Sequence, residues 1–195
     1  MGRPVNDTAK ERILAAASAL FLEGGAAALS VRALAARAGL STMGLYSHFN
    51  GKQGILDALY VEGFGLVAQA IDGASGASPR QIVMDAAARY LDMADGHRAH
   101  YRLIFGQADP GYTPSPEARQ VGARAFARMT SQVATLLPPD APVPARQDAA
   151  MQVWSLLHGA VALRDHAVAD MVAMEGWRDR TLAALELLID GIRTS

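Results

Sequence analysis

The sequence contains no cysteine, and that absence removes several kinds of chemistry at once. Without thiols the chain has no disulfide, no thiolate metal site and no cysteine nucleophile. The absence also agrees with a reducing cytoplasm, which is where we expect the protein to act. The first twelve residues, MGRPVNDTAKER, lack the apolar core that a signal peptide needs, so secretion is not expected.

Long hydrophobic runs are missing as well. The longest uncharged stretch inside an expected helix is Ala149–Leu163, which has 15 residues and includes Gln152, Ser155 and His158. A bilayer requires about 20 apolar residues, so the sequence predicts no membrane span and no membrane partner.

Motifs for catalysis are absent too. The sequence has no glycine loop that would cradle a phosphate and no G-x-S-x-G nucleophile elbow, and GQADPG at residues 106–111 is neither. Four histidines invite comparison with a metal site, since His97 and His100 are three residues apart, and His158 and His166 follow later. No matching carboxylate pattern supports them, which favours packed or solvated histidines. We therefore expect no enzyme, no metal and no cofactor.

The residues that are present favour helix. Apolar residues make up 51% of the 195 residues, which is enough for a globular core, while alanine is abundant and β-branched runs are few. The composition therefore predicts an all-α protein.

Charge is distributed unevenly along the chain. The net charge is −1, but residues 1–52 carry six basic and three acidic side chains, a balance of +3, and the remainder carries −4. A local positive field suits phosphate binding, and screening over about 10 Å keeps the acidic part from cancelling it.

The basic end contains LSVRALAARAGLSTMGLYSHFNGK at residues 29–52, which predicts two short helices joined by a tight turn. Ser30 can cap the first helix. Gly39 can end it in the left-handed conformation, with Leu40 tucked behind. The residues that share one face of this first helix are Val31, Leu34, Ala35 and Ala38.

Ser41 can cap a second helix, which the pattern extends from Thr42 to Phe49 before Asn50–Gly51 breaks it. Leu45 and Phe49 are four residues apart and are expected to face inward. The side chains left outside are Thr42, Met43, Tyr46 and Ser47. A short helix with donors outward is what a major groove accepts, which predicts a helix-turn-helix.

The motif S-V-R-x-L-A-x-R-A-G-L-S followed by G-L-Y-x-H-F and a lysine resembles the N-terminal domain of TetR-type transcriptional repressors, over Thr8–Lys52 without a gap. The resemblance implies a three-helix DNA-binding domain followed by a larger helical domain for ligand binding and dimerisation. In the DNA-binding domain the first helix packs across the other two, and the expected core consists of Ile13, Phe21, Leu34, Leu45 and Phe49. The resemblance also implies a homodimer that binds a palindromic DNA operator and is released by a small molecule.

DNA-contacting roles follow by position. Arg32 is expected to read a base, because a guanidinium can bond guanine O6 and N7 together. Met43 and Gly44 suit a thymine methyl group. His48 is expected at a phosphate, or as a cation favoured by a helix C-terminus. Arg3, in a loose arm, is expected either at DNA or in solvent. The expected DNA-binding residues are Arg32, Ser41, Thr42, Met43, Gly44, Tyr46, Ser47, His48 and Lys52, the last as a phosphate anchor.

Further helices are expected over residues 8–23, 52–71, 81–94, 97–105, 117–137, 145–169 and 177–193, the first capped by Asp7 or Thr8. Proline- and glycine-rich segments separate several of them. The segment Trp154–Gly159, WSLLHG, resembles the C-terminal regulatory domain type named for its Trp-His-Gly signature, found in some TetR-like regulators.

Two sets of residues in the C-terminal part are expected to have functional roles, one in dimer formation and one in ligand binding. A stripe at helical spacing is expected to form a dimer interface, because it looks too apolar for water; with two small residues before it, the set is Gly159, Ala162, Leu182, Leu185, Ile189 and Ile192. Aromatic and methionine side chains are expected to line a ligand cavity or to be core; they are Phe64, Tyr90, Met93, Tyr101, Phe105, Phe126, Met129, Trp154 and His158.

These expectations give residues 1–51 as the DNA-binding domain and residues 52–195 as the regulatory and dimerisation domain. We expect a ligand-responsive repressor whose effector is small and mostly apolar. The alternative uses the same N-terminal domain in a DNA-binding regulator or architectural protein without an inducer, controlled by a protein partner. A ligand-sized cavity in the C-terminal domain would separate the two readings.

Overall fold

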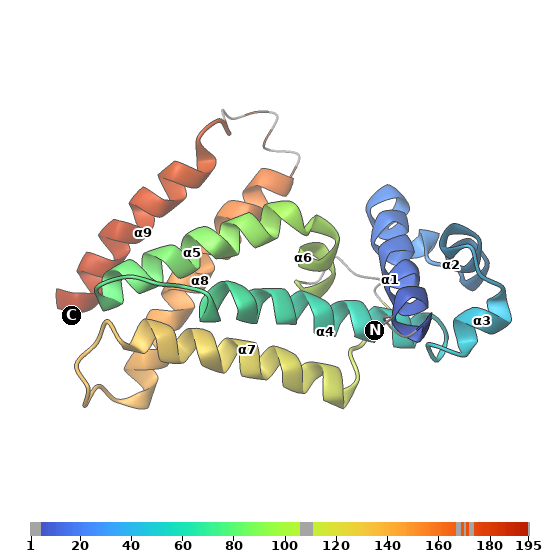
Figure 1. Ribbon diagram of the computed structural model, residues 1–195. Coiled ribbons are helices and arrows are strands. Elements are labelled where there is room, and N and C mark those ends of the chain that lie inside the picture. Colours follow the sequence, from blue (N-terminus) through green and yellow to red (C-terminus); the bar gives the residue numbers. More distant parts are fainter. Residues whose placement is uncertain (1–4, 106–110, 167–168, 170, 172–173, 195) are drawn as a thin grey trace. The chain divides into compact units, whose positions relative to one another are not determined.

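The computed structural model describes residues 5–105, 111–166, 169, 171 and 174–194, and those residues form α-helices, one short 3₁₀-helix and connecting turns, with no strand (Figure 1). The all-α prediction is therefore confirmed. Arg3 lies outside the described residues.

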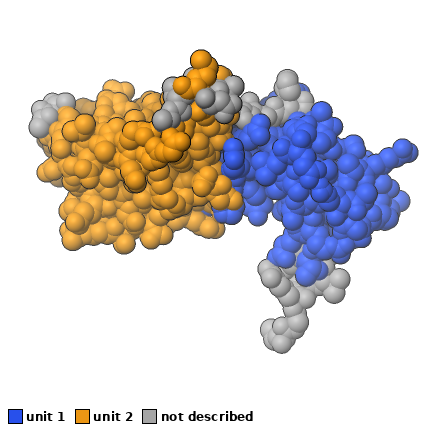
Figure 2. Space-filling view, turned by 90° about the horizontal axis from the view of Figure 1, so that it is seen from above, with its two compact units in different colours: residues 1–65, 97–122 blue, residues 66–96, 123–195 orange. Residues whose placement is uncertain are grey.

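The chain divides into two compact units (Figure 2). Unit 1 comprises residues 1–65 and 97–122, and unit 2 comprises residues 66–96 and 123–195. The predicted functional boundary between residues 51 and 52 stays a prediction, and the compact units divide the chain at other places.

Unit 1 contains the N-terminal helices and one later helix. Its complete elements are α1 (Val5–Gly24), η1 (Gly25–Ala28), α2 (Val31–Ala38), α3 (Thr42–Tyr46) and α6 (Arg98–Ile104). It also holds the first parts of α4 (Gly51–Asp72) and α7 (Pro116–Ala134). Because α1 begins at Val5, Asp7 and Thr8 lie inside the helix, and the prediction that one of them is the N-cap is wrong.

The core of unit 1 follows from the spacing of apolar residues on α1. Ile13, Ala17 and Phe21 repeat at four-residue intervals and are almost fully buried. Helix α1 packs against α2, η1 and α6. Leu34 and Leu45 have no exposed surface, as expected, whereas Phe49 is only partly buried. Burying one large apolar side chain stabilises the fold by about 1.5–3 kcal/mol.

Helices α4 and α6 approach closely because of a glycine. A Cβ added at Gly63 would lie 2.7 Å from Ile104 Cγ2, so a larger residue would push the helices apart. Next to this contact, His100 Nε2 and Glu62 Oε2 are 3.0 Å apart. This hydrogen bond lowers the pKa of Glu62. Polar and steric contacts together therefore fix α6 on the first half of α4.

The segment before α7 is also held on α4. Asp57 accepts hydrogen bonds from the Tyr112 hydroxyl at 2.9 Å and from the Ser115 backbone N–H at 3.1 Å. Gln53 Nε2 donates to the Thr113 carbonyl at 2.8 Å. Burial, followed by the bond to Asp57, raises the pKa of Tyr112 well above its usual range, so its phenol remains a donor at any ordinary pH.

Helix α4 is, among the described helices, the one long and apolar enough to cross a membrane by length and composition alone. Core helices of soluble proteins satisfy the same criterion. Ile55, Leu56 and Leu59 of α4 are each at most 2% exposed within the protein. These three side chains are therefore already covered by other parts of the chain.

Unit 2 contains α5 (Pro79–Gly96), α8 (Val143–Asp165) and α9 (Trp177–Thr194), which pack pairwise against one another. Pro79 occupies the first position of α5, as its missing N–H favours. The inner face of α8 consists of Ala149, Ala150, Val153, Leu157 and Val161. These side chains pack with the buried faces of α5 and α9 in the core of the unit.

The expected dimer stripe on α9 is part of this core. Leu185 and Ile189 have no exposed surface in a single chain, and Ile192 is 7% exposed. Side chains with almost no free surface cannot contact a second chain, so the prediction that these three form the dimer interface is wrong. The stripe is covered by α5 and α8 of its own chain instead. Leu182 is partly exposed.

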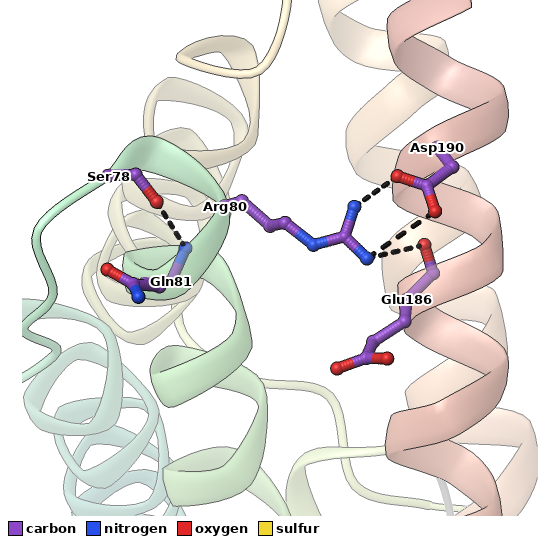
Figure 3. A network of polar contacts seen from close by, with 5 residues as sticks. All are labelled: Ser78, Arg80, Gln81, Glu186 and Asp190. Atoms are coloured by element: carbon purple, nitrogen blue, oxygen red, sulfur yellow. Dashed lines mark hydrogen bonds and ion pairs between the residues drawn. The ribbon is translucent and has the colours of Figure 1, made fainter.

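Polar contacts join α5 to α9 at the edge of the unit 2 core. Arg80 forms an ion pair with Asp190, and its Nη2 also lies 3.5 Å from the Glu186 carbonyl oxygen (Figure 3). Ser78 Oγ accepts a hydrogen bond from Gln81 N at 3.3 Å, which caps α5 beside this contact. Exposed pairs of this kind contribute about 0–1 kcal/mol each, so the buried apolar contacts provide most of the stability of the unit.

The other end of α5 is fastened by arginines of α8 and α9. Arg164 Nη1 lies 3.0 Å from Asp95 Oδ1, and its guanidinium carbon lies 4.9 Å from the centre of the Trp177 ring. Arg178 pairs with Asp92 and donates to the Ala88 carbonyl at 3.2 Å. The C-terminal half of α5 is thus tied to both helices that cover it.

The chain passes from one unit to the other at three places, and the residue before each passage is a glycine. The three places are Gly65–Leu66, Gly96–His97 and Gly122–Ala123. An added Cβ would meet no atom within 4 Å at Gly65 or Gly96. At Gly122 it would lie 3.1 Å from the Tyr60 hydroxyl. Close packing therefore explains Gly122 but not the other two.

We predict that Leu185→Asp unfolds unit 2, because it places an unpaired carboxylate where the side chain has no exposed surface. The matched control is Val143→Asp, which introduces the same charge at a position that is 64% exposed in the first turn of α8. Circular dichroism melting should show a large loss of stability for Leu185→Asp and a melting temperature near the wild-type value for Val143→Asp. A folded Leu185→Asp protein would contradict this packing.

Candidate nucleic-acid interface

Both ends of α2 are fixed by local hydrogen bonds. Ser30 Oγ accepts from Ala33 N at 3.1 Å, which confirms the predicted N-cap. Gly39 closes the helix with φ of +65°, a left-handed conformation that L side chains rarely adopt. Leu40 and Ser41 then lead directly into α3, as the sequence predicts.

Helix α3 is shorter than predicted. Ser41 Oγ accepts from Gly44 N at 3.0 Å, which confirms the expected cap, but the helix ends at Tyr46 and not at Phe49. Ser47 Oγ donates to the Gly44 carbonyl at 2.7 Å, and the Leu45 carbonyl accepts from both His48 N and Phe49 N. This shared acceptor tightens the last turn into an irregular one.

The side chains expected to face DNA lie on the exposed side of α2 and α3. Met43 is 77% exposed and Tyr46 is 55% exposed, whereas Leu45 between them has no exposed surface. The other exposed members of the predicted set are Arg32, Ser41, Thr42 and Ser47. This side therefore combines hydroxyl and guanidinium donors with apolar surface. We call it the reading face, and it consists of Arg32, Ser41, Thr42, Met43, Tyr46 and Ser47.

Three members of the predicted set lie differently. Gly44 and His48 are only partly exposed. Lys52 is also partly buried, and its Nζ donates to the Ala26 carbonyl in η1 at 3.0 Å. Lys52 thus links the start of α4 to the connection between α1 and α2, a structural contact that the spacing of the motif did not indicate.

Two parts of the chain match models of known protein families. Residues 13–59 match the model described as "Bacterial regulatory proteins, tetR family", and residues 83–185 match "Tetracyclin repressor-like, C-terminal domain". The second match alone spans more than half of the chain. The chain belongs to the TetR family. The Trp-His-Gly subtype suggested by Trp154–Gly159 is not confirmed, since the C-terminal match names a tetracycline-repressor-like domain.

Solved structures agree with a TetR fold along nearly the whole chain. A tetR-family regulatory protein from Rhodococcus RHA1 is 22% identical over 94% of this chain and 96% of that chain, with a TM-score of 0.72. The TetR family transcriptional regulator PfmR from Thermus thermophilus is 21% identical over 92% and 97%, with a TM-score of 0.70.

The transcriptional regulator SCO7222, a TetR from Streptomyces coelicolor, is 25% identical over 94% of this chain and 97% of that chain, with a TM-score of 0.65. No curated protein matches the chain. The family matches identify a DNA-binding transcriptional regulator, and the structures establish that its helix-turn-helix and its helical C-terminal part have TetR counterparts.

The aromatic residues considered for a ligand cavity in this TetR-family protein belong to both units. In unit 1, the Phe105 ring centre is 6.0 Å from that of Phe64 and 4.8 Å from that of Tyr101. The remaining members lie in unit 2: Tyr90, Met93, Phe126, Met129, Trp154 and His158.

Within unit 2 three rings of the set form a chain. The Trp154 ring centre is 6.1 Å from Phe126 and 5.6 Å from His158. Burial lowers the pKa of His158, which favours its neutral form. Tyr90 and Met93 are each 6% exposed and contribute to the core of the unit. No group of three metal-binding side chains occurs among the residues that the structure describes.

The outer faces of α8 and α9 carry exposed apolar residues in addition to those predicted for a dimer interface. Gly159 and Ala162 of the expected interface lie on α8 and retain exposed surface. An open groove of about 610 Å³ lies between α8 and α9, lined by Asp148, Met151, Gln152, Ser155, Leu156, Ala184 and Leu188. Leu187, which is 74% exposed, follows Ala184 by three residues. The sequence signal for this outer surface was a second set of apolar residues on α8 and α9, Met151, Leu187 and Leu188, which lie outside the buried stripe.

Replacing Arg32 and Lys52 should have separable effects on DNA binding. Arg32→Ala is expected to cost about 1–3 kcal/mol on the specific site alone, because the base contact expected of Arg32 would be lost. Lys52→Ala should weaken binding to all sequences. It should also lower the salt slope, which is the change of log affinity with log salt concentration, by the contribution of about one phosphate contact. Loss of the Lys52 bond to Ala26 would not itself change that slope. Titrations of both variants at several salt concentrations decide the matter, and equal weakening of specific and random DNA by Arg32→Ala would refute its role.

Proposed function

We propose that this protein is a cytoplasmic repressor that binds a palindromic operator as a homodimer and is released by a small, mostly apolar molecule. The reading face carries the proposal, because its exposed donors and apolar surface stand on a buried core. Arg32 would read a base edge, and Thr42, Met43 and Ser47 would enter the major groove. Tyr46, His48 and Lys52 would hold phosphates.

The outer face of α8 and α9 supports dimer formation through these helices. Met151 is 44% exposed and Leu187 is 74% exposed, so the face offers apolar surface to a partner. Gly159 and Gly191 have no atom within 4 Å of an added Cβ, which leaves room for close approach of another backbone. A two-fold axis through such a face would pair α8 and α9 with their copies in a four-helix arrangement.

The dimer is tested by Leu187→Asp. A carboxylate at this exposed position is tolerated in a single chain, but in the proposed interface it would be buried in both subunits at once. Light scattering should give a mass near 20.6 kDa for the variant and about twice that for the wild type. Operator affinity should fall with the dimer. A dimeric Leu187→Asp protein that binds its operator would place the interface elsewhere.

The proposed effector would contact aromatic side chains of unit 2, with His158 as its polar handle. Phe126 and Trp154, whose ring centres are 6.1 Å apart, would supply apolar contact area. The two recognition helices of a dimer must reach major grooves about 34 Å apart. An effector that prefers a conformer with a different spacing shifts the population away from the DNA-competent state.

Selection of bound fragments from the source genome by the purified protein would test DNA recognition and suggest the effector class from neighbouring genes. Candidate molecules are then assayed by thermal shift. The effector must weaken operator binding by the same factor by which operator weakens effector binding, with a coupling of about 1–3 kcal/mol. An operator without any stabilising small molecule would favour the alternative in which a protein partner controls the regulator.

A further inference from the structure

Arg12 connects α1 to the turn of the helix-turn-helix. Its Nη2 donates hydrogen bonds to the backbone carbonyls of Ala38 and Gly39, the latter at 3.0 Å. These acceptors are 26 and 27 residues away in the sequence. Arg12 therefore joins the first helix to the point where α2 ends and the chain turns toward α3.

The hydrogen bonds at the end of α2 explain why this link fits. Leu40 N donates to the Ala35 carbonyl at 2.9 Å and Gly39 N donates to the Ala36 carbonyl at 3.2 Å, the two bonds of a Schellman motif. That motif leaves the carbonyls of Ala38 and Gly39 without a partner from its own turn. The positively charged Arg12 guanidinium bonds both, at the negative end of the helix dipole.

The geometry of the turn and the position of Arg12 depend on each other. An added Cβ at Gly39 would lie 2.8 Å from Arg12 Nη2, so a side chain there would displace the guanidinium. Gly39 also has φ of +65°. Glycine thus permits both the left-handed turn and the approach of Arg12. Two residues later Ser41 caps α3, so the direction of α3 follows directly from this turn.

We propose that Arg12 is a positioning residue for operator recognition, acting through the turn and not through DNA. It holds the carbonyls of Ala38 and Gly39 against α1, and so fixes the angle at which α3 presents Met43 and Tyr46. This inference rests on the proposed function of the reading face. Random DNA, which is held through its phosphates, depends less on that angle than a specific sequence does.

The test measures the affinity of full-length Arg12→Ala for two probes, a fragment selected from the source genome and a random duplex of equal length. Affinity for the selected fragment should fall by about tenfold, because a bond to a charged donor is lost at each carbonyl. Affinity for random DNA and the salt slope should stay near the wild-type values. Arg12→Lys keeps the charge and places its N–H donors on a single nitrogen, so it should recover part of the discrimination.

Glu23→Gln is the matched control. Glu23 of α1 pairs with Arg37 of α2, with Arg37 Nη1 at 3.2 Å from Glu23 Oε1, so it also links these two helices but not the turn. Both groups are exposed, and such pairs contribute little. Glu23→Gln should therefore keep the wild-type ratio of the two affinities and a similar melting temperature.

Three results would overturn the proposal. A salt slope lowered by about one in Arg12→Ala would make Arg12 a phosphate contact. Equal loss of both affinities together with a lower melting temperature would indicate general destabilisation. An unchanged ratio of the two affinities would show that the turn does not need Arg12; if Arg12→Ala does not fold, Arg12→Met, which keeps the aliphatic part of the side chain and removes the charge and the donors, gives the same comparison. A wild-type protein that prefers no fragment would instead refute the proposed function itself.

Discussion

The sharp turn at Gly39 is the constraint on which the reading face depends. Its left-handed backbone lets α2 end and α3 begin within a few residues, each with its own serine cap. Leu34 and Leu45, on either side of the turn, then have no exposed surface. Because both are anchored in the core of unit 1, the polar and apolar side chains on the outside of α2 and α3 are held in a fixed pattern that DNA can meet.

Local structure in this region was predictable because it depends on neighbouring residues. The caps at Ser30 and Ser41 and the turn at Gly39 are short-range features, and the structure places each as expected. The length of α3 was not predictable from apolar spacing, since Leu45 and Phe49 satisfy the helical period. The helix ends at Tyr46 instead. At this end the Ser47 hydroxyl donates to the Gly44 carbonyl, and the Leu45 carbonyl accepts from two backbone N–H groups.

The apolar stripe on α9 was identified correctly as buried but assigned to the wrong partner. Periodicity tells which side of a helix avoids water, and it does not tell whether the same chain or a second chain provides the cover. Leu185 is enclosed by its own unit, whereas Leu187 and Met151 remain on the outer side. The long-range contacts of Arg12, Lys52 and Asp57 were likewise invisible, because their partners lie 26 to 58 residues away in the chain.

The interleaving of the two units has a consequence for synthesis. Residues 97–122 belong to unit 1, and α6 packs on α1, so the DNA-reading unit cannot be complete until residue 122 has left the ribosome. Residues 66–96 must meanwhile wait for α8 and α9, which pack on α5 and its buried Val83 and Leu91 only after residues 143–194 have been synthesised. A fragment that ends after the helix-turn-helix would therefore lack a packed helix, and α5 keeps apolar surface uncovered on the nascent chain until α8 and α9 have been synthesised.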